Sequence, residues 1–167
     1  MEKEITEVYC GNGRGKTTLA IGQALRASSQ GKSVIIIQFL KGNERRELDF
    51  LEELDQLDIK IFRFEKMESC YDQLNEEEQA EEERNILNGL NFARKVIATQ
   101  ECDFLVLDEI LGLLDKHIAT VDMVVWLLKQ KDESMHLILT GNRVDPGILD
   151  YVDSVTTITT LGREQNS

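Results

Sequence analysis

A glycine-rich segment near the N-terminus carries the residues best suited to bind a phosphate chain. Three glycines alternate along it, and Lys16 and Thr17 follow the last of them. Because glycine has no Cβ atom, backbone N–H groups can converge on an anion, while Lys16 would add a cation and the Thr17 hydroxyl could bind Mg²⁺. The candidate phosphate-binding residues are Gly11, Asn12, Gly13, Arg14, Gly15, Lys16, Thr17 and Thr18.

The spacing in this segment differs by one position from the usual phosphate-binding loop. The strict pattern is G-x-x-x-x-G-K-[ST], whereas here Cys10 stands at the first glycine position and Gly11 follows it. An apolar stretch, residues 5–9, precedes the loop, and a helix-forming run, residues 17–29, comes after it. This strand–loop–helix context favours a phosphate site over a glycine-rich turn that binds nothing.

Two adjacent acids, Asp108 and Glu109, form a second candidate for chemistry. They follow a run of apolar residues, which is the Walker B arrangement. In that arrangement a buried strand carries a carboxylate to its carboxyl end, where it binds Mg²⁺ directly or through water. A strand that ends in an ordinary helix cap would look similar, but the phosphate loop earlier in the chain favours a metal site. We therefore expect Thr17, Asp108 and Glu109 to hold Mg²⁺.

The elements that must position these residues alternate between strand and helix. Strands are predicted from apolar, alternating or threonine-rich runs at residues 5–9, 33–40, 59–64, 103–109, 135–141 and 155–160. Helices are predicted at residues 17–29, 44–57, 76–99, 121–131 and 146–151. The alternation predicts one α/β domain over residues 1–167, a three-layer sandwich with a mainly parallel sheet.

Composition narrows the classes of partner and compartment. The formal net charge of −12 argues against nucleic acid or an anionic membrane as a partner, because both require a basic surface. The acidic block at residues 76–83 is expected to be a solvated helix face. The three cysteines are widely spaced, which argues against a disulfide framework, and no apolar run reaches a membrane-spanning length. We expect a cytoplasmic protein.

These motifs together resemble the ATP:corrinoid adenosyltransferases of the CobA/CobO/BtuR type. The family's shortened loop, G-N-G-[KR]-G-K-T-T, has the same displaced first glycine. The resemblance continues with Gln-Phe-Leu-Lys-Gly at residues 38–42, Leu-Val-Leu-Asp-Glu-Ile at residues 105–110 and Leu-Thr-Gly at residues 139–141. The motifs occur in the family's order along most of the chain.

The resemblance implies a RecA-like P-loop fold, a homodimer and a specific reaction. The reduced cobalt of a corrinoid, cobalamin or cobyrinic acid diamide, would attack the 5′ carbon of ATP and expel triphosphate. Reduced cobalt is itself the nucleophile, so the implied catalytic residues are Lys16, Thr17 and Glu109, which with Mg²⁺ would stabilise the leaving group. Lys41 could face either the nucleotide or the corrinoid. A flavoprotein is a candidate reductant.

Two positions depart from the family pattern. The aromatic residue expected beneath the corrinoid has two candidates: Tyr71 fits by its distance from Asp108, whereas Phe64 fits by its neighbouring residues. The family's Thr-Gly-Arg reads Thr-Gly-Asn-Arg here, so the arginine is displaced to Arg143.

Two other function classes are compatible with the phosphate loop. One is a P-loop ATPase that hydrolyses ATP to ADP and phosphate, with Glu109 polarising water. The other is a relative that binds ATP or a corrinoid without catalysis. The reaction products would distinguish an adenosyltransferase, an ATPase and a non-catalytic relative from one another.

Overall fold

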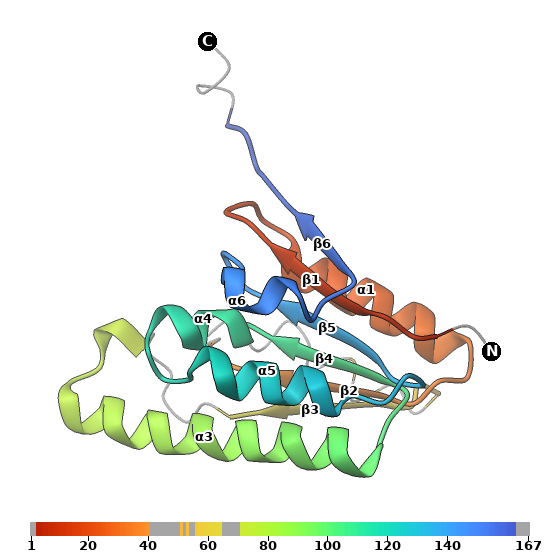
Figure 1. Ribbon diagram of the computed structural model, residues 1–167, viewed down its shortest axis with the longest axis horizontal. Coiled ribbons are helices and arrows are strands. Elements are labelled where there is room, and N and C mark those ends of the chain that lie inside the picture. Colours follow the sequence, from red (N-terminus) through yellow and green to blue (C-terminus); the bar gives the residue numbers. More distant parts are fainter. Residues whose placement is uncertain (1–2, 41–50, 52, 54–55, 65–70, 163–167) are drawn as a thin grey trace.

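The protein is built around one parallel sheet. The structure is a computed structural model that describes residues 3–40, 51, 53, 56–64 and 71–162 (Figure 1). Its six strands lie in the order β3-β2-β4-β5-β1-β6, and every neighbouring pair is parallel. The strands are β1 Thr6–Cys10, β2 Val34–Gln38, β3 Ile59–Arg63, β4 Phe104–Asp108, β5 His136–Thr140 and β6 Ser154–Thr157. The predicted parallel α/β sheet is confirmed.

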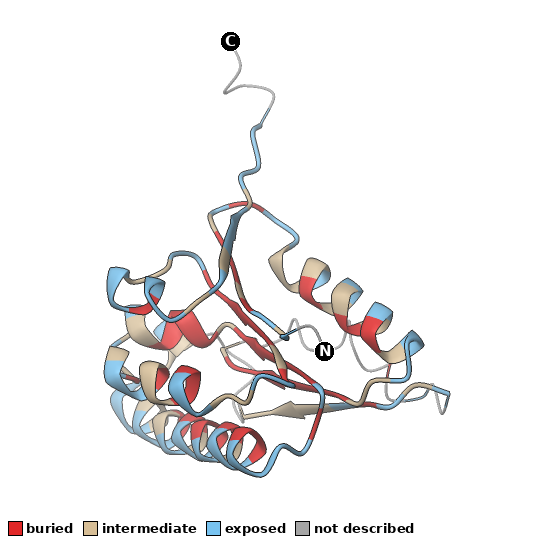
Figure 2. Ribbon diagram, turned by 45° about the vertical axis from the view of Figure 1, so that its right-hand side comes forward, coloured by how far each residue is buried: buried red, intermediate tan, exposed pale blue. Residues whose placement is uncertain are grey.

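Helices cover both faces of the sheet (Figures 1 and 2). One face carries α1 (Lys16–Ser29), and the other carries α3 (Glu76–Thr99), α4 (Ile110–Asp115), α5 (Val121–Gln130) and α6 (Pro146–Leu149). A short 3₁₀ helix, η2 (Tyr71–Gln73), precedes α3. The helix predicted at residues 44–57 lies largely outside the described residues.

Two apolar cores hold the three layers together. Along β2, Ile35 and Ile37 join the core under α3 and α5, whereas Val34 and Ile36 join the core under α1. This division follows from the pleat, because successive side chains of a strand point to opposite faces. All five residues of β2 are buried, which explains why its sequence is continuously apolar rather than alternating.

Strand register brings the candidate site residues to one edge of the sheet. Gln38 at the end of β2 pairs with Asp108 at the end of β4, and Tyr9 of β1 pairs with Thr140 at the end of β5. The glycine loop leaves β1 at the same carboxyl edge. Ligands of open α/β sheets bind at this edge.

Several local expectations need correction. Helix α4 is not predicted from the sequence, and residues 71–73 form a 3₁₀ helix rather than a plain loop. Glu82, expected on a solvated face, is buried. Strand β6 ends at Thr157 rather than at residue 160. Asn75 caps α3, with a capping box completed by Glu78.

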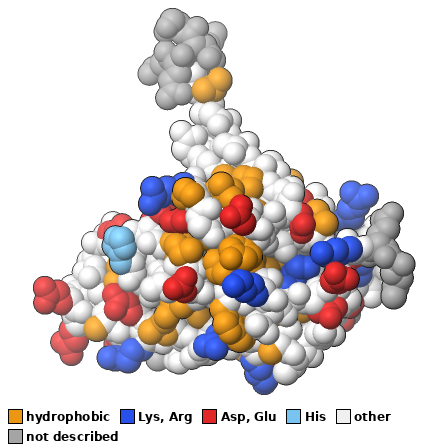
Figure 3. Space-filling view, viewed as in Figure 1, with side chains coloured by type: hydrophobic (Ala, Val, Ile, Leu, Met, Phe, Trp, Pro, Cys, Tyr) orange, Lys and Arg blue, Asp and Glu red, His pale blue; other side chains and the backbone are white. Residues whose placement is uncertain are grey.

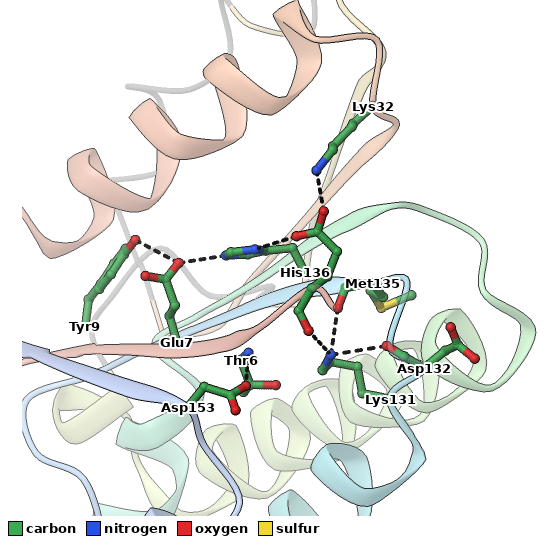
Figure 4. A network of polar contacts seen from close by, with 10 residues as sticks. Thr6, Glu7, Tyr9, Lys32, Lys131, Asp132, Met135, His136 and Asp153 are labelled. Carbon is green, nitrogen blue, oxygen red and sulfur yellow. Dashed lines mark hydrogen bonds and ion pairs between the residues drawn. The ribbon is translucent and has the colours of Figure 1, made fainter. Parts of the chain in front are cut away.

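The amino edge of the sheet, opposite the candidate site, is held by a polar network (Figure 4). The His136 ring stacks on Phe104, and its Nε2 lies 2.7 Å from a carboxylate oxygen of Glu7. Its Nδ1 lies 3.2 Å from Glu4, which also accepts a hydrogen bond from Lys32 Nζ at 2.6 Å. His136 therefore contributes to the packing of the strand edge.

The outer surface over α5 and α6 is partly apolar. Figure 3 shows hydrophobic side chains gathered there, and Met123, Leu149 and Tyr151 are exposed. Trp126 is only half-buried, and the Arg94 guanidinium lies 4.2 Å from its ring centroid. Among the described residues, no helix is long and apolar enough to cross a lipid bilayer.

Candidate active site

The glycine loop connects β1 to α1 and holds Lys16 above it. Gly15 precedes the helix with a φ of 98°, a backbone conformation that favours glycine. Lys16 Nζ donates to the carbonyl oxygens of Gly11 at 2.7 Å and Gly13 at 3.1 Å, and to Asn142 Oδ1 at 3.3 Å. The ammonium group is thus placed over the loop, where it can neutralise a phosphate.

The first turn of α1 supplies backbone donors beside this lysine. The first hydrogen bond from an α1 amide to a carbonyl at i−4 runs from Leu19 N to Gly15 O. The preceding N–H groups, at residues 16–18, have no intrahelical acceptor because they open the helix. Together with the positive end of the helix dipole, they form an anion site of the predicted kind. Asn12, Arg14 and Thr18 are exposed around it.

Asp108 lies at the centre of a buried hydrogen-bond cluster. Its carboxylate accepts from Thr17 Oγ1 at 3.0 Å, from Thr140 Oγ1 at 2.7 Å and from Gln38 Nε2 at 3.1 Å, and Asp108 is 1% exposed. Each donor comes from a different element. The cluster therefore fixes the Thr17 side chain relative to the ends of β2, β4 and β5.

Sequence analysis missed Gln38 and Thr140 as members of this cluster. Both lie inside the motifs that carry the family resemblance, Gln-Phe-Leu-Lys-Gly and Leu-Thr-Gly. Polar residues at the ends of otherwise apolar strands are the signal that could have identified them. A buried polar side chain needs a partner, and the adjacent strand ends supply it.

Glu109 follows Asp108 and faces a pocket. Its φ of 65° turns the chain sharply from β4 into α4, and its backbone N–H donates to Thr140 Oγ1 at 2.8 Å. The pocket has a volume of about 380 Å³. It is lined by Leu40, Tyr71, Asp72, Glu109, Gly112, Asp115, Lys116 and Asn142. Asn142 contributes to both this pocket and the Lys16 contacts, so the two regions adjoin at this residue.

The oxygen donors of the site are compatible with Mg²⁺. Thr17 offers a hydroxyl that is oriented by its hydrogen bond to Asp108. Glu109, the residue directly after Asp108, offers a carboxylate. The described part of the chain has no group of three or more His, Cys, Asp or Glu side chains that could hold a metal. Mg²⁺ is usually bound by few protein oxygens together with substrate phosphates and water.

The two aromatic candidates occupy different environments. Tyr71 lines the pocket, and its hydroxyl donates to Glu83. Burial, together with the Glu83 carboxylate, raises the pKa of Tyr71 to about 12, so the phenol stays neutral. Phe64 instead packs on Phe92 and against Gly89 of α3, where an added Cβ would lie 2.6 Å from its ring. Lys41 lies outside the described residues.

Arg143 pairs with the last residue of α4. Its Nε donates to Asp115 Oδ1 at 2.8 Å, and its side chain is exposed. Asn142 takes the place beside the loop: its backbone oxygen accepts from Gly11 N at 2.8 Å. Asn142, which lies two residues after β5, therefore contacts the loop through both its backbone oxygen and its side-chain oxygen.

A solved structure shares this fold. The KaiC-like protein PH0186 from Pyrococcus horikoshii OT3 matches with a TM-score of 0.62 and 19% identity, over 93% of this chain and 71% of that one. At this identity the match concerns the fold alone, and it confirms the predicted RecA-like architecture.

Sequence relatives identify the family. The corrinoid adenosyltransferase of Escherichia coli (strain K12) is 30% identical over 160 residues, which cover 93% of this chain and 76% of that protein. The corrinoid adenosyltransferase CobA of Salmonella typhimurium (strain LT2) is 28% identical over 158 residues, again 93% and 76% of the two chains. The family model for ATP:corrinoid adenosyltransferase BtuR/CobO/CobP matches residues 2–165. The chain therefore belongs to the ATP:corrinoid adenosyltransferase family.

Proposed function

We propose that this chain transfers the 5′-deoxyadenosyl group of ATP to the reduced cobalt of a corrinoid and releases triphosphate. The transferase class and the two substrates, ATP and a corrinoid, follow from family membership. The observation that best supports the proposal is the position of Asn142, which contacts Lys16 and also lines the pocket that contains Tyr71 and Glu109. One ligand could lie on each side of this residue.

In the proposed reaction one bond forms and one breaks. A cobalt–carbon bond forms at C5′ as the cobalt donates its electron pair, and the C5′–O5′ bond breaks with its electrons passing to triphosphate. No proton has to be removed from a nucleophile. The protein must align the two substrates and stabilise the charge on the departing triphosphate.

The chain has a group for each of these electrostatic tasks. Lys16 Nζ and the amides of residues 16–18 would bind the phosphates. Thr17 and Glu109 would hold Mg²⁺, which, when bound, supplies further positive charge at the leaving group. Asp108 is assigned a different role, because its carboxylate already accepts hydrogen bonds from Thr17, Gln38 and Thr140. We assign Asp108 to the orientation of Thr17, with its contact to the metal made through that hydroxyl or through water.

On the corrinoid side we assign Tyr71 rather than Phe64. Tyr71 lines the pocket next to Glu109, whereas Phe64 is packed against α3. Lys41 follows Leu40, a lining residue of the same pocket. It stays a candidate for contact with either substrate.

An anaerobic assay with ATP, Mg²⁺ and chemically reduced cobalamin tests the proposal. The spectrum of the cobalt–carbon product and the phosphate products are followed together. Adenosylated corrinoid with equimolar triphosphate is the expected result. ADP and phosphate without a corrinoid product would instead identify an ATPase, and ATP binding without turnover would identify a non-catalytic relative.

Three further properties stay proposals. The family resemblance suggests a homodimer, which sedimentation at several protein concentrations would test. It also suggests a flavoprotein reductant, which would be replaceable by a chemical reductant in the assay. A cytoplasmic location is the prediction from composition and could be tested by cell fractionation.

A further inference from the structure

The segment that follows β6 runs along the phosphate loop. Strand β6 lies beside β1 at the edge of the sheet (Figure 1), and their pairing ends with Cys10 opposite Thr157. The hydrogen bonds continue past both strands. Ile158 N donates to Cys10 O at 2.8 Å, and Ile158 O accepts from Gly13 N at 2.8 Å. Thr160 Oγ1 then accepts from Arg14 N at 2.8 Å. We refer to residues 158–160 as the clamp segment.

Two of the three alternating glycines make room for this segment. A Cβ on Gly11 would lie 2.3 Å from Ile158 O, and a Cβ on Gly13 would lie 2.6 Å from the same oxygen. Both distances are too short for any side chain to be accommodated without movement of the backbone. Gly15, by contrast, has no atom within 4 Å of the Cβ position. Its positive φ, rather than close packing, accounts for that glycine.

The backbone donors of the loop are therefore divided into two groups. The N–H groups of Gly11, Gly13 and Arg14 are bound by the protein itself, through Asn142 and the clamp segment. Those of residues 16–18 open α1 and face outward along the helix axis. The first group fixes the shape of the loop, and the second group is oriented toward a ligand.

The clamp segment also fixes the acceptors that hold the catalytic lysine. Lys16 Nζ donates to Gly11 O and Gly13 O. These carbonyls belong to the residues that contact Ile158. A shift of the segment would therefore move both the amides of the loop and the ammonium group that faces the phosphates.

We propose that the clamp segment is a positioning element for the triphosphate of ATP, with Thr160 as its positioning residue. The inference rests on the proposed function in that it names the ligand of the loop. Thr160 touches no substrate in this scheme. It acts through the Arg14 peptide, which it holds in the geometry that phosphate binding requires.

The test compares Thr160→Val, which removes the hydroxyl acceptor at nearly constant volume, with Thr160→Ser, which keeps it. Thr156→Val is the matched control, because Thr156 lies exposed on β6 before the clamp segment and its hydroxyl makes no hydrogen bond within the described residues. For each variant we would measure the Kd for ATP·Mg²⁺, the KM for ATP and for cob(I)alamin, kcat, and hydrogen exchange at the Arg14 amide.

Thr160→Val is expected to raise the Kd and KM for ATP roughly three- to tenfold, the effect of one hydrogen bond. The KM for the corrinoid and kcat should stay within twofold by this reasoning, and exchange at the Arg14 amide should become faster. Thr160→Ser should restore all values, and Thr156→Val should match the wild type. Unchanged or tighter ATP binding in Thr160→Val would overturn the proposal, as would equal losses for both substrates.

The two proposals fail in different ways. If the wild-type protein forms no adenosylated corrinoid, the proposed function falls, while ATP affinity and amide exchange still decide the role of Thr160. If the wild type is active and Thr160→Val binds ATP equally well, the clamp proposal falls and the function stands.

Discussion

At the scale of single residues, the site depends on one buried carboxylate that joins three other elements. Asp108→Asn would keep one acceptor but turn an amide donor toward one of Thr17, Thr140 or Gln38. Because a buried donor would lose its partner, we expect a loss of about 1–3 kcal/mol in the free energy of unfolding. Affinity for ATP·Mg²⁺ should fall at least tenfold, roughly the effect of one charged hydrogen bond, as measured by titration.

The matched control is a change at Asp103, which directly precedes β4 at the amino edge of the sheet. Asp103 accepts from the backbone N–H and hydroxyl of Ser33 at the amino edge. Asp103→Asn should lower stability modestly and leave ATP affinity unchanged. Equal losses of affinity in both variants would show that the effect of Asp108→Asn is a general loss of folding.

Lys16 is the second residue with a direct test. Its ammonium group lies over the loop carbonyls, and Lys16→Ala would remove it. We expect kcat/KM for ATP-dependent adenosylation to fall by a factor of 100 or more, on the order of the cost of losing one transition-state charge contact. Lys60→Ala, an exposed lysine on β3, serves as the control. Activity retained by Lys16→Ala would refute the phosphate-loop assignment.

Tyr71 allows the corrinoid assignment to be tested by the oxidation state of the substrate. Since an aromatic ring beneath the corrinoid would help to displace a lower cobalt ligand, Tyr71→Ala should impair the reaction of corrinoid supplied as cob(II) more than that of cob(I). Phe64→Leu should lower thermal stability and affect both substrates equally, because Phe64 packs on Phe92. The reverse pattern would move the assignment to Phe64.

At the scale of elements, the sequence predicts what is locally encoded. The strands β2, β4 and β5 are recognisable because a strand buried on both faces is continuously apolar. Helix α3 is recognisable from its length and its capping residue Asn75. Helix α4 has only six residues, so a 3.6-residue period does not develop, and its apolar start continues the run of β4.

The same distinction explains which site residues could be predicted. The glycine loop and the acidic pair are local motifs, so their spacing identifies them. Gln38 and Thr140 reach Asp108 only because β2 and β5 lie on either side of β4. Thr160 meets Arg14 across 146 positions of sequence. Such non-local contacts depend on strand order, which no local pattern in one sequence specifies.

Helix α4 owes its position to a glycine on the neighbouring strand end. A Cβ on Gly141 would lie 2.4 Å from Leu111 Cβ, so Gly141→Ala should push α4 away from β5 and displace Glu109 at its start. We expect a loss of about 1–3 kcal/mol in the free energy of unfolding, typical of overpacking, together with weaker binding of ATP·Mg²⁺.

Gly22→Ala is the control with the same chemical change. Gly22 lies exposed in α1 with nothing within 4 Å, and alanine there should stabilise by up to about 1 kcal/mol. Thermal melts of both variants should therefore shift in opposite directions.

At the scale of the whole molecule, the amino and carboxyl edges of the sheet, where the parallel strands begin and end, have different roles. The carboxyl edge gathers Gln38, Asp108, Thr140 and the glycine loop, and it forms the candidate active site. The amino edge gathers Glu4, Glu7, Lys32 and His136 into a network of polar contacts (Figure 4). Since β5 spans both edges from His136 to Thr140, they are separated by roughly 13 Å of strand. Stability can therefore be altered at one edge without reaching the chemistry at the other.

The pH dependence of folding tests this separation. The hydrogen bond from Lys32 is the largest of the causes that lower the pKa of Glu4 from its usual 4.5, and His136 contributes further, against the opposing effect of burial. A carboxyl group whose pKa is lowered by folding stabilises the protein at pH values above its unfolded pKa, and this contribution is lost as the pH falls through the folded pKa. Glu4→Gln should therefore be less stable than the wild type at pH 7, and the difference should shrink below about pH 4.5.

Denaturant unfolding at several pH values would measure this convergence, with Glu133→Gln as the control. Glu133 forms a pair with Lys3 that is largely exposed, so its loss should change stability little at any pH. The KM for ATP at pH 7 should be the same in both variants and in the wild type, because neither residue lies at the carboxyl edge. A stability difference for Glu4→Gln that persists unchanged to pH 3 would show that the carboxylate charge is not what Glu4 contributes. A raised KM for ATP in Glu4→Gln would instead show that the two edges are coupled through the strands.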